Sequence, residues 1–311
     1  MRRSLSRLAL LGAAFAMLGS TPSLAWGPDA HRVVALIAER VLQQSDPAAL
    51  KKLNALLATD KSHATRTDIA SEATWADVLR DKSEEARSAT TPWHAVRLNA
   101  QNPDLSAACF GRQPLPEGYP ASHGPRENCA VDKVLQFRKE LANPETTSFE
   151  RVAAVQYLLN LVADLNDPLL AIDHGDQGGN CVAVQIGGKP PVRLATYWET
   201  TLPAEVIGAN PIQAAGKLAA APADAKSGAA GDPESWAKDS FEVAKSVTYG
   251  FASTPGSNAD VPMPKGESLS CASVPVYKAD PDYETKAQAA LRQQLTKAGL
   301  RLASVLSEGL K

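Results

Sequence analysis

Apolar residues recur at helical spacing along much of the chain. In residues 29–44 they fall three or four positions apart, at Val33, Val34, Ile37, Ala38, Val41 and Leu42. Pro47 favours the start of a second helix, which the pattern carries through Leu57. A third helix is predicted over residues 68–87. The N-terminal part of the chain is therefore predicted to be helical.

The clearest helical signal begins at Thr147. Thr147 and Glu150 have the spacing of a capping box. The residues that would form the apolar side are Val152, Val155, Leu158, Leu159 and Val162. Pro168 lies just past the end of this pattern, and further helices are predicted over residues 233–247 and 282–308.

Two segments lack the helical pattern. Residues 90–128 are rich in Pro, Gly and Asn and are predicted to form a long irregular loop. Residues 176–180 (Asp-Gln-Gly-Gly-Asn) indicate a turn, and the alternation of Val182, Val184 and Ile186 before two glycines indicates a small β-hairpin. The expected fold is mainly α, a single helical domain with one minor hairpin.

The first 25 residues have the pattern of a secretory signal peptide. Three arginines precede an apolar run over residues 8–18, and a small-x-small site ends at Ala25. The run is too short to anchor the chain in a bilayer. Cleavage there would make Trp26 the first residue of a mature domain over residues 26–311. We expect export to the periplasm or the extracellular medium.

The charge balance limits how this protein could hold a polyanion. Removing the three leader arginines from 32 basic residues leaves 29 against 34 acidic residues, a net charge of −5. This is not the basic surface of a protein held to nucleic acid by charge alone. Binding of nucleic acid would need a local site, such as metal ions.

Few residues stand out as carriers of chemistry. The five histidines are His31, His63, His94, His123 and His174. Taken alone, His31 is expected on an exposed helix face, and His94 is as consistent with a structural role as with a functional one. Asp164 falls in a strongly apolar helix, where a carboxylate needs a partner, and Asn160 shares its face one turn earlier. This pair indicates a site or, alternatively, a hydrogen-bonded core pair.

Several motifs in order give the chain a specific resemblance. They are Trp26-Gly27 followed by His31, Ala-Thr-Trp-Ala-Asp-Val-Leu-Arg at 73–80, the stretch from Tyr157 through Asp164 to Leu169, the turn at 176–180, and Ser235-Trp236-Ala237. With these motifs the chain resembles the single-strand-specific, trinuclear-zinc nucleases (the S1/P1 nuclease family), which are related in fold to bacterial zinc phospholipase C. The resemblance spans nearly the whole mature chain.

The resemblance implies which residues would bind zinc. One ion would be held by Trp26, His31 and Asp164, and another by Asp77, His94, Asn160 and Asp164. Asn160 stands where the family has histidine, and an amide oxygen is a weaker zinc ligand than imidazole.

A further zinc site of the family is depleted in this chain. Its ligands would lie at Leu170, Ala195 and Glu199, where the family has His, His and Asp. Leucine and alanine cannot bind metal, so the site is lost unless His174, Asp173 or Asp167 takes their place. We therefore expect fewer than three zinc ions.

The resemblance also suggests roles near the phosphate. Arg80 matches the arginine thought to face the phosphate, so that Asp77, Arg80 and Asp164 are the candidates for catalysis. Ala95 stands where an aromatic residue usually follows the histidine, so one base-stacking surface is missing.

Four cysteines in an exported chain predict two disulfides. Their spacing contains no CxxC pair, which argues against a cysteine-zinc site. The resemblance favours Cys109–Cys271, which would leave Cys129 and Cys181. The simpler local pairing, Cys109–Cys129, is the alternative.

Three functions follow from these observations. The first is a metal-dependent phosphodiesterase, an endonuclease on single-stranded DNA or RNA, with activity weakened or lost through the changes at Asn160, Leu170 and Ala195. The second is an inactive relative that binds nucleotide, phosphate or a protein partner. A phospholipase-like enzyme ranks last, because the loop at 90–128 is polar. We expect a monomer with no membrane span.

Overall fold

A computed structural model describes residues 26–220, 231–251, 256, 261–262 and 271–311. The predicted signal peptide lies outside the described residues. The described chain is largely helical, which confirms the mainly α fold class. Among the described residues, no helix combines the length and apolar composition needed to cross a membrane.

The helices and strands follow one another along the chain. The α-helices are α1 (Pro28–Ser45), α2 (Pro47–Leu57), α3 (Ile69–Glu72), α4 (Trp75–Asp81), α5 (Glu84–Thr90), α6 (Leu105–Ala108), α7 (Ala130–Ala142), α8 (Ser148–Asp164), α9 (Pro168–Ala171), α10 (Leu194–Thr196), α11 (Leu202–Ile207), α12 (Pro211–Ala219), α14 (Pro233–Val243) and α15 (Tyr283–Gly309). Short turns of 3-10 or π helix are η1 (Thr91–His94), η2 (Ala121–His123), η3 (Tyr197–Thr201) and η4 (Ala244–Thr248). The strands are β1 (Leu98–Asn99), β2 (Ile172–Asp173), β3 (Ala183–Gln185), β4 (Val192–Arg193) and β5 (Val276–Lys278).

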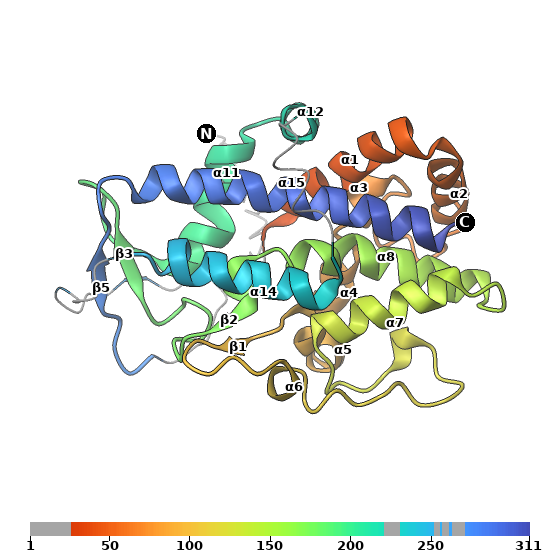
Figure 1. Ribbon diagram of the computed structural model, residues 1–311, viewed down its shortest axis with the longest axis horizontal. Helices are drawn as coiled ribbons and strands as arrows, with labels where there is room; N and C mark the ends of the chain where they lie inside the picture. The colour runs from red at the N-terminus through yellow and green to blue at the C-terminus, as the bar shows by residue number, and fades with distance from the viewer. Residues whose placement is uncertain (1–25, 221–230, 252–255, 257–260, 263–270) are drawn as a thin grey trace, which may run out of the picture.

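The core lies around α8, whose residues are buried from Val152 to Asp164. On one side α15 runs along most of the molecule and packs on α1 (Figure 1). Gly299 allows this close approach, because a Cβ there would collide with the Ile37 side chain. On another side α7 packs on α8, where the Phe137 and Tyr157 rings stack with centroids 4.6 Å apart.

The strongest sequence signals are confirmed. Helix α8 begins after Thr147, whose hydroxyl accepts a hydrogen bond from the Glu150 amide at 3.3 Å and donates one to the Glu150 carboxylate at 2.9 Å. The other helices predicted from periodicity also form, as α1, α2, α14 and α15. Helices α7, α11 and α12 were not predicted.

The single helix predicted over residues 68–87 is wrong. The segment instead forms the three short helices α3, α4 and α5. The side chain of Asp68 accepts from the Ser71 amide and caps the predicted start, whereas that of Ser83 accepts from the Ala86 amide and caps a new helix, α5, within the predicted span. Such side-chain bonds compete with a continuous helical backbone.

The disulfides settle the cysteine pairing. Residues 90–128 are mostly irregular, as predicted, and Cys109 in this loop pairs with Cys129 at the start of α7. Cys271 pairs with Cys181. The pairing Cys109–Cys271 is therefore wrong, because the loop folds back on itself and brings the Cα atoms of Cys109 and Cys129 within 4.8 Å.

Two small sheets complete the fold. Strands β3 and β4 pair antiparallel, which confirms the predicted hairpin, and β5 adds a parallel third strand that was not predicted. Strands β1 and β2 pair in parallel, with Leu98 opposite Ile172 and Asn99 opposite Asp173. This second pair joins the segment after η1 to the segment after α9.

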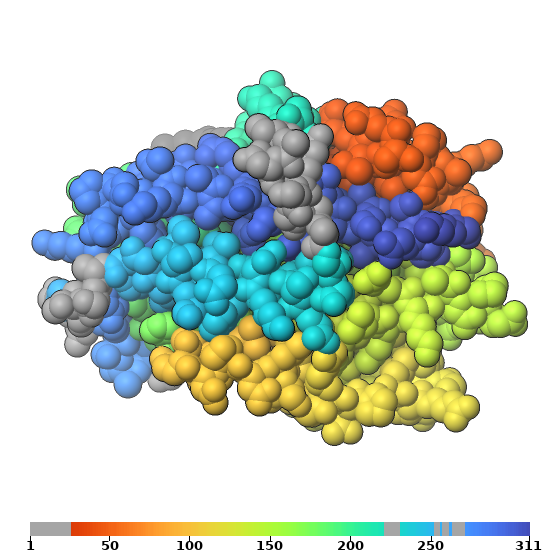
Figure 2. Space-filling view, in the orientation of Figure 1, coloured from red at the N-terminus to blue at the C-terminus, as the bar shows by residue number. Residues whose placement is uncertain are grey.

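A buried polar network fixes the chain just after α8. Helices α14 and α15 lie side by side on one face of the molecule (Figure 2). From α15, the Gln294 amide donates to the Asn166 carbonyl at 2.9 Å and to the Ser240 hydroxyl at 3.0 Å. Arg301, also on α15, donates to the side chains of Asn166 and Asp239. The end of α8 is thus held by two helices distant in sequence.

Loss of the Cys181–Cys271 disulfide should destabilise the protein more than loss of Cys109–Cys129. The two bonds join residues separated by 90 and 20 positions, and the longer loop restricts the unfolded chain more. We expect replacement of both cysteines by alanine to lower the free energy of unfolding by about 4–5 kcal/mol for the long loop and about 3 kcal/mol for the short one. Urea denaturation of the two double variants measures this. An equal or reversed loss would contradict the loop argument.

The burial of Lys133 should make the stability of the protein depend on pH. Its buried amine donates to the Ala121 carbonyl at 2.6 Å and lies 3.7 Å from the Trp93 ring centre. Burial lowers its pKa from 10.5 to about 7, with Glu140 and Asp132 opposing the shift. Between these values the unfolded chain binds more protons than the folded one, so Lys133 makes stability rise with pH.

Lys133→Met should remove this contribution. The free energy of unfolding of the wild type, relative to Lys133→Met, should rise between pH 7 and 10 by at most about 1.4 kcal/mol per pH unit. Denaturation curves of both proteins across this range test it. Parallel pH profiles would show that Lys133 is charged in the folded protein.

Candidate metal centre

Asp164 lies at the end of the apolar helix α8 and is almost fully buried. Three residues from other elements surround it. Asp164 Oδ2 lies 2.7 Å from His94 Nδ1 in η1, and Asp164 Oδ1 lies 3.6 Å from His31 Nε2 in α1. The same His31 nitrogen is 3.7 Å from Asp77 Oδ2 in α4. The structure thus brings together residues from four elements that are far apart in the sequence.

Asn160 belongs to the same cluster. It lies one turn before Asp164, as the sequence predicted. Its amide nitrogen donates to Asp77 Oδ2 at 2.8 Å and to the Ala73 carbonyl at 3.0 Å, and it lies 3.4 Å from His31 Nδ1. The pair of Asn160 and Asp164 is therefore part of a larger polar site rather than an isolated pair in the core.

The exposure expected for His31 from the residues alone is wrong. His31 is fully buried. It lies three and seven residues before Val34 and Ala38, on the face of α1 that packs into the core. Because Asp77 and Asp164 lie opposite this position, a polar residue fits on an otherwise apolar face.

Polar atoms without hydrogen-bond partners gather in this cluster. Among the described residues, they include His31 Nε2, His94 Nε2, Asn160 Oδ1 and Asp164 Oδ1. A buried polar atom without a partner costs about 1–3 kcal/mol. Imidazole nitrogens with carboxylate oxygens are a donor set that zinc binds. The donor chemistry of this cluster is therefore of the kind that holds a cation.

The electrostatics of the cluster also favour a cation. Burial, with the neighbouring Asp77, raises the pKa of Asp164 to about 8 against the opposing effects of His31 and Arg80. Burial also acts to raise the pKa of Asp77, but His31, Arg80 and then His94 outweigh it, and its pKa is lowered. Two carboxylates thus share one buried site, and a cation between them would favour ionisation of both.

His94 is neutral at physiological pH. Burial lowers its pKa to about 4, and Arg80 adds to this effect against Asp77 and Asp81. A neutral imidazole is the form that binds metal.

Arg80 lies beside the cluster, almost fully buried. Its Nη1 is 2.9 Å from Asp77 Oδ1, and its Nε donates to Asp81 Oδ1 at 3.3 Å. Two carboxylates thus hold the guanidinium next to the metal-binding candidates.

Trp26 packs against the segment that follows α8. Its side chain is buried, and its backbone nitrogen donates to Asp167 Oδ2 at 3.1 Å. Burial raises the pKa of Asp167 to about 7. Asp167, which the sequence suggested only as a substitute ligand, thus lies directly against Trp26. Its position three residues after Asp164 is the signal that could have ranked it higher.

The positions of the depleted third site form part of the packed interior. Leu170 and Ala195 are each 2% exposed, and Glu199 is 5% exposed. The Ala195 amide donates to the Gly179 carbonyl at 3.1 Å. A Cβ at Gly179, where φ is +84°, would lie only 3.0 Å from that amide nitrogen. Backbone and apolar side chains thus occupy this region, and Glu199 is the one acidic residue of the three.

Two of the possible substitutes for these ligands are engaged elsewhere. His174 is exposed, and its ring stacks on Tyr249 with centroids 4.4 Å apart. Asp173 is also exposed, and its Oδ1 accepts a hydrogen bond from the Gly175 amide at 2.9 Å.

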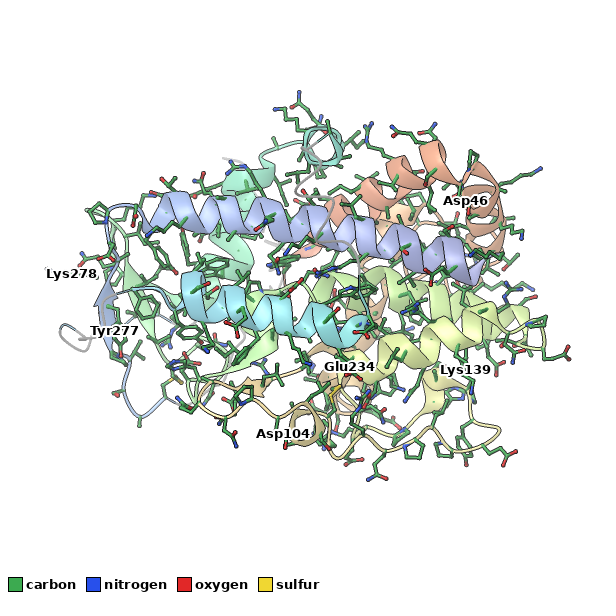
Figure 3. All side chains as sticks on the ribbon, in the orientation of Figure 1. Asp46, Asp104, Lys139, Glu234, Tyr277 and Lys278 are labelled. Carbon is green, nitrogen blue, oxygen red and sulfur yellow. A yellow bond between two sulfur atoms is a disulfide. The ribbon has the colours of Figure 1, made fainter. Side chains whose placement is uncertain are left out.

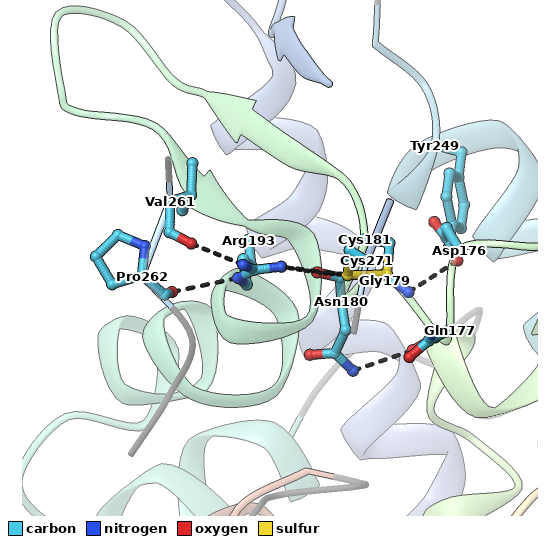
Figure 4. Close-up of a disulfide and its surroundings, with 10 residues drawn as sticks. All are labelled: Asp176, Gln177, Gly179, Asn180, Cys181, Arg193, Tyr249, Val261, Pro262 and Cys271. Atoms are coloured by element: carbon cyan, nitrogen blue, oxygen red, sulfur yellow. Dashed lines mark hydrogen bonds between the residues drawn. A yellow bond between two sulfur atoms is a disulfide. The ribbon is translucent and has the colours of Figure 1, made fainter. Parts of the chain in front are cut away.

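The predicted turn at residues 176–180 forms a rigid corner (Figure 4). Asp176 accepts hydrogen bonds from the Gly179 amide and from the Tyr249 hydroxyl, each at 2.9 Å. The Asn180 side chain donates to the Gln177 carbonyl at 3.0 Å, and Arg193 donates to the Asn180 carbonyl. The Cys181–Cys271 disulfide follows directly and anchors the turn.

Comparisons with known proteins identify the family of this chain. The family model described as S1/P1 Nuclease matches residues 26–311. The chain is also similar to Endonuclease 4 of Arabidopsis thaliana, with 23% identity over 168 residues, covering 52% of this chain and 50% of the relative. The match thus spans about half the length of that relative. Because the family model covers nearly all of the chain, this protein belongs to the S1/P1 nuclease family.

Proposed function

We propose that this protein is a metal-dependent phosphodiesterase that cleaves single-stranded DNA or RNA with fewer than three zinc ions. The observation that carries this proposal is the buried cluster around Asp164, in which several nitrogen and oxygen atoms lack hydrogen-bond partners. The family, which is zinc-dependent in general, supports the same chemistry. The name of the relative, Endonuclease 4, agrees with a nucleic-acid substrate.

Two sets of ligands share Asp164. One set is Trp26, His31 and Asp164, and the other is Asp77, His94, Asn160 and Asp164. When bound, zinc supplies an activated water nucleophile at neutral pH and neutralises charge on the phosphate. Since Asp164 serves both sets, the proposed centre depends on it more than on any other residue.

The surrounding residues position these groups. The His94 ring turns Nδ1 toward the cluster, 2.7 Å from Asp164 Oδ2 and 4.0 Å from Asp77 Oδ1. Arg80, held by Asp77 and Asp81, provides a fixed positive charge to stabilise charge that develops on the phosphate. Ala95 contributes no aromatic surface beside His94.

The depleted third site supports weakened activity. Leu170 and Ala195 are buried and apolar, and only Glu199 could supply an oxygen ligand there. Loss of one cation removes part of the charge stabilisation that phosphodiester cleavage needs. The same observation favours a second candidate, a relative that binds nucleotide or phosphate without cleaving it.

Export is part of the proposal. The two disulfides fit a secreted protein. We propose that the chain begins at Trp26 after cleavage and acts as a monomer in the periplasm or the extracellular medium.

The first test is metal content and cleavage by the mature chain. We expect one or two zinc ions per chain and cleavage of single-stranded DNA that a chelator abolishes. Asp164→Asn should lower both zinc affinity and cleavage rate by more than about 100-fold, because it removes a ligand of both sets. Asp280→Asn, at an exposed carboxylate, is the control and should change neither.

The outcomes separate the two candidate functions. Bound zinc without cleavage would favour the binding relative. A chain without bound zinc, even when zinc is supplied in excess, would refute the metal centre.

Asn160→His should strengthen zinc binding. The substitution replaces an amide with the imidazole that zinc prefers, at a position 2.8 Å from Asp77. We expect zinc affinity to rise by at least about 10-fold, the lower end of what a supporting group is worth. Competition with a chromogenic chelator measures the affinity.

Gln156→His is the matched control. Gln156 lies one turn earlier on α8, is equally buried and donates to Glu72 rather than to the cluster. Its replacement should leave zinc affinity unchanged. Equal effects of the two substitutions would mean that the added histidine acts outside the proposed centre.

A further inference from the structure

Four aromatic side chains line a cleft of about 440 Å³ beside the turn at residues 176–180; they are His174, Tyr249, Phe251 and Tyr277. The His174 and Tyr249 rings are nearly parallel, at 9° and 4.4 Å. The Tyr249 and Phe251 ring centres are 6.0 Å apart, and those of Phe251 and Tyr277 are 4.8 Å apart. We call this the aromatic cleft. Its rings form a continuous row, and each is at least partly exposed.

The aromatic cleft lies close to the metal centre. A smaller pocket of about 240 Å³ opens next to the centre and is lined by His94, Ala95, Arg97 and Leu170, among others. Leu170 is only four residues from His174, so their Cα atoms are at most about 14 Å apart. A few nucleotides of a single strand span this distance, since successive phosphates of a stacked strand are spaced by about 3.4 Å along its axis.

Arg97 stands between the two openings. It lines the small pocket and reaches Gly178 of the turn, where a Cβ would lie 2.6 Å from Arg97 Nη1. Nη1 also donates to the Leu169 carbonyl at 3.4 Å. Arg97 is exposed and, within the described part of the chain, forms no ion pair with a carboxylate. An exposed guanidinium without a carboxylate partner can form hydrogen bonds to a phosphate.

The Tyr249 ring is held in place before any ligand binds. Its hydroxyl donates to both oxygens of Asp176, at 2.9 and 3.1 Å. Tyr277 lies on β5 at one end of the molecule (Figure 3) and is partly buried against the hydrophobic core. Fixed aromatic faces bind planar ligands at low cost in conformational entropy.

We propose that the aromatic cleft binds bases of the single strand whose phosphodiester lies at the metal centre, with Arg97 contacting a phosphate between them. This inference rests on the proposed function. Stacking of bases on aromatic rings tolerates any sequence, because every base has a flat face. Stacking would also supply binding that two other features of this chain do not provide. Ala95 offers no aromatic ring at the centre, and the mature net charge of −5 does not favour binding by charge alone.

The test compares a long ligand with a short one. The double variant His174→Ala, Tyr277→Ala should bind an eight-nucleotide oligothymidylate about 5- to 100-fold more weakly than the wild type does. Its affinity for thymidine monophosphate, which is too short to reach from the centre to the cleft, should not change. Phosphorothioate linkages keep the strand from being cleaved, and fluorescence anisotropy or calorimetry gives the dissociation constants.

Two further variants control for structure. Phe149→Ala removes an aromatic side chain that is 77% exposed at the start of α8, and it should leave both affinities unchanged. His174→Phe, made in the wild type, keeps a flat ring and should retain the affinity for the long strand, whereas His174→Ala alone should lose part of it. This pattern would attribute the effect to stacking.

Other results would overturn the inference. They are an unchanged affinity of the double variant for the long strand, an equal loss for the long and short ligands, or the same loss with Phe149→Ala. Because the assay measures binding and not turnover, it separates the two proposals. A protein that cleaves but shows no length-dependent loss refutes only the aromatic cleft, and one that shows the loss but never cleaves refutes only the nuclease activity.

Discussion

The burial of one carboxylate, that of Asp164, constrains the rest of this structure. An ionised group inside an apolar helix is costly unless other polar groups surround it. The chain brings His31, Asp77 and His94 to it from three other elements. These partners are themselves buried or partly buried and keep atoms without hydrogen bonds. Each partner thus offsets part of the cost of burying Asp164 and adds buried polar atoms of its own, and the proposed cation would bind to the atoms that remain.

Such a cluster needs a rigid frame, and distant parts of the chain supply it. Gln294 and Arg301 of α15 hold Asn166, two residues after Asp164, so the end of α8 cannot shift independently. Gly299 lets α15 approach α1, which carries His31. The C-terminal helix, which contributes no metal-ligand candidate, therefore positions two of the elements that do. A fault in this packing would misplace the site without changing any residue in it.

The sequence predicted what depends on local order and missed what depends on tertiary contact. Helix α8 was predictable because its cap at Thr147 and its apolar period agree. The segment at 68–87 was not, because capping by Ser83 begins a new helix inside a plausible helical pattern. In the site, Asn160 and Asp164 were visible as neighbours on one helix. The convergence of the other members could be inferred only from the resemblance, since no local spacing links residues so far apart.

The cost of burying charge also explains why the cluster around Asp164 is polar whereas Leu170 and Ala195 are apolar. Removing Asp164 would leave two histidines and Asp77 buried without their common partner, which carries a large penalty. The positions of Leu170 and Ala195 differ, because each lies against backbone and apolar neighbours such as the turn at Gly179. An apolar side chain there removes surface from water and leaves no charge behind. The cluster around Asp164 is therefore tied to the stability of the fold. The further zinc site proposed from the resemblance could be replaced by apolar side chains at little cost in stability. Substrate binding would then depend more on surfaces beyond the metal ligands.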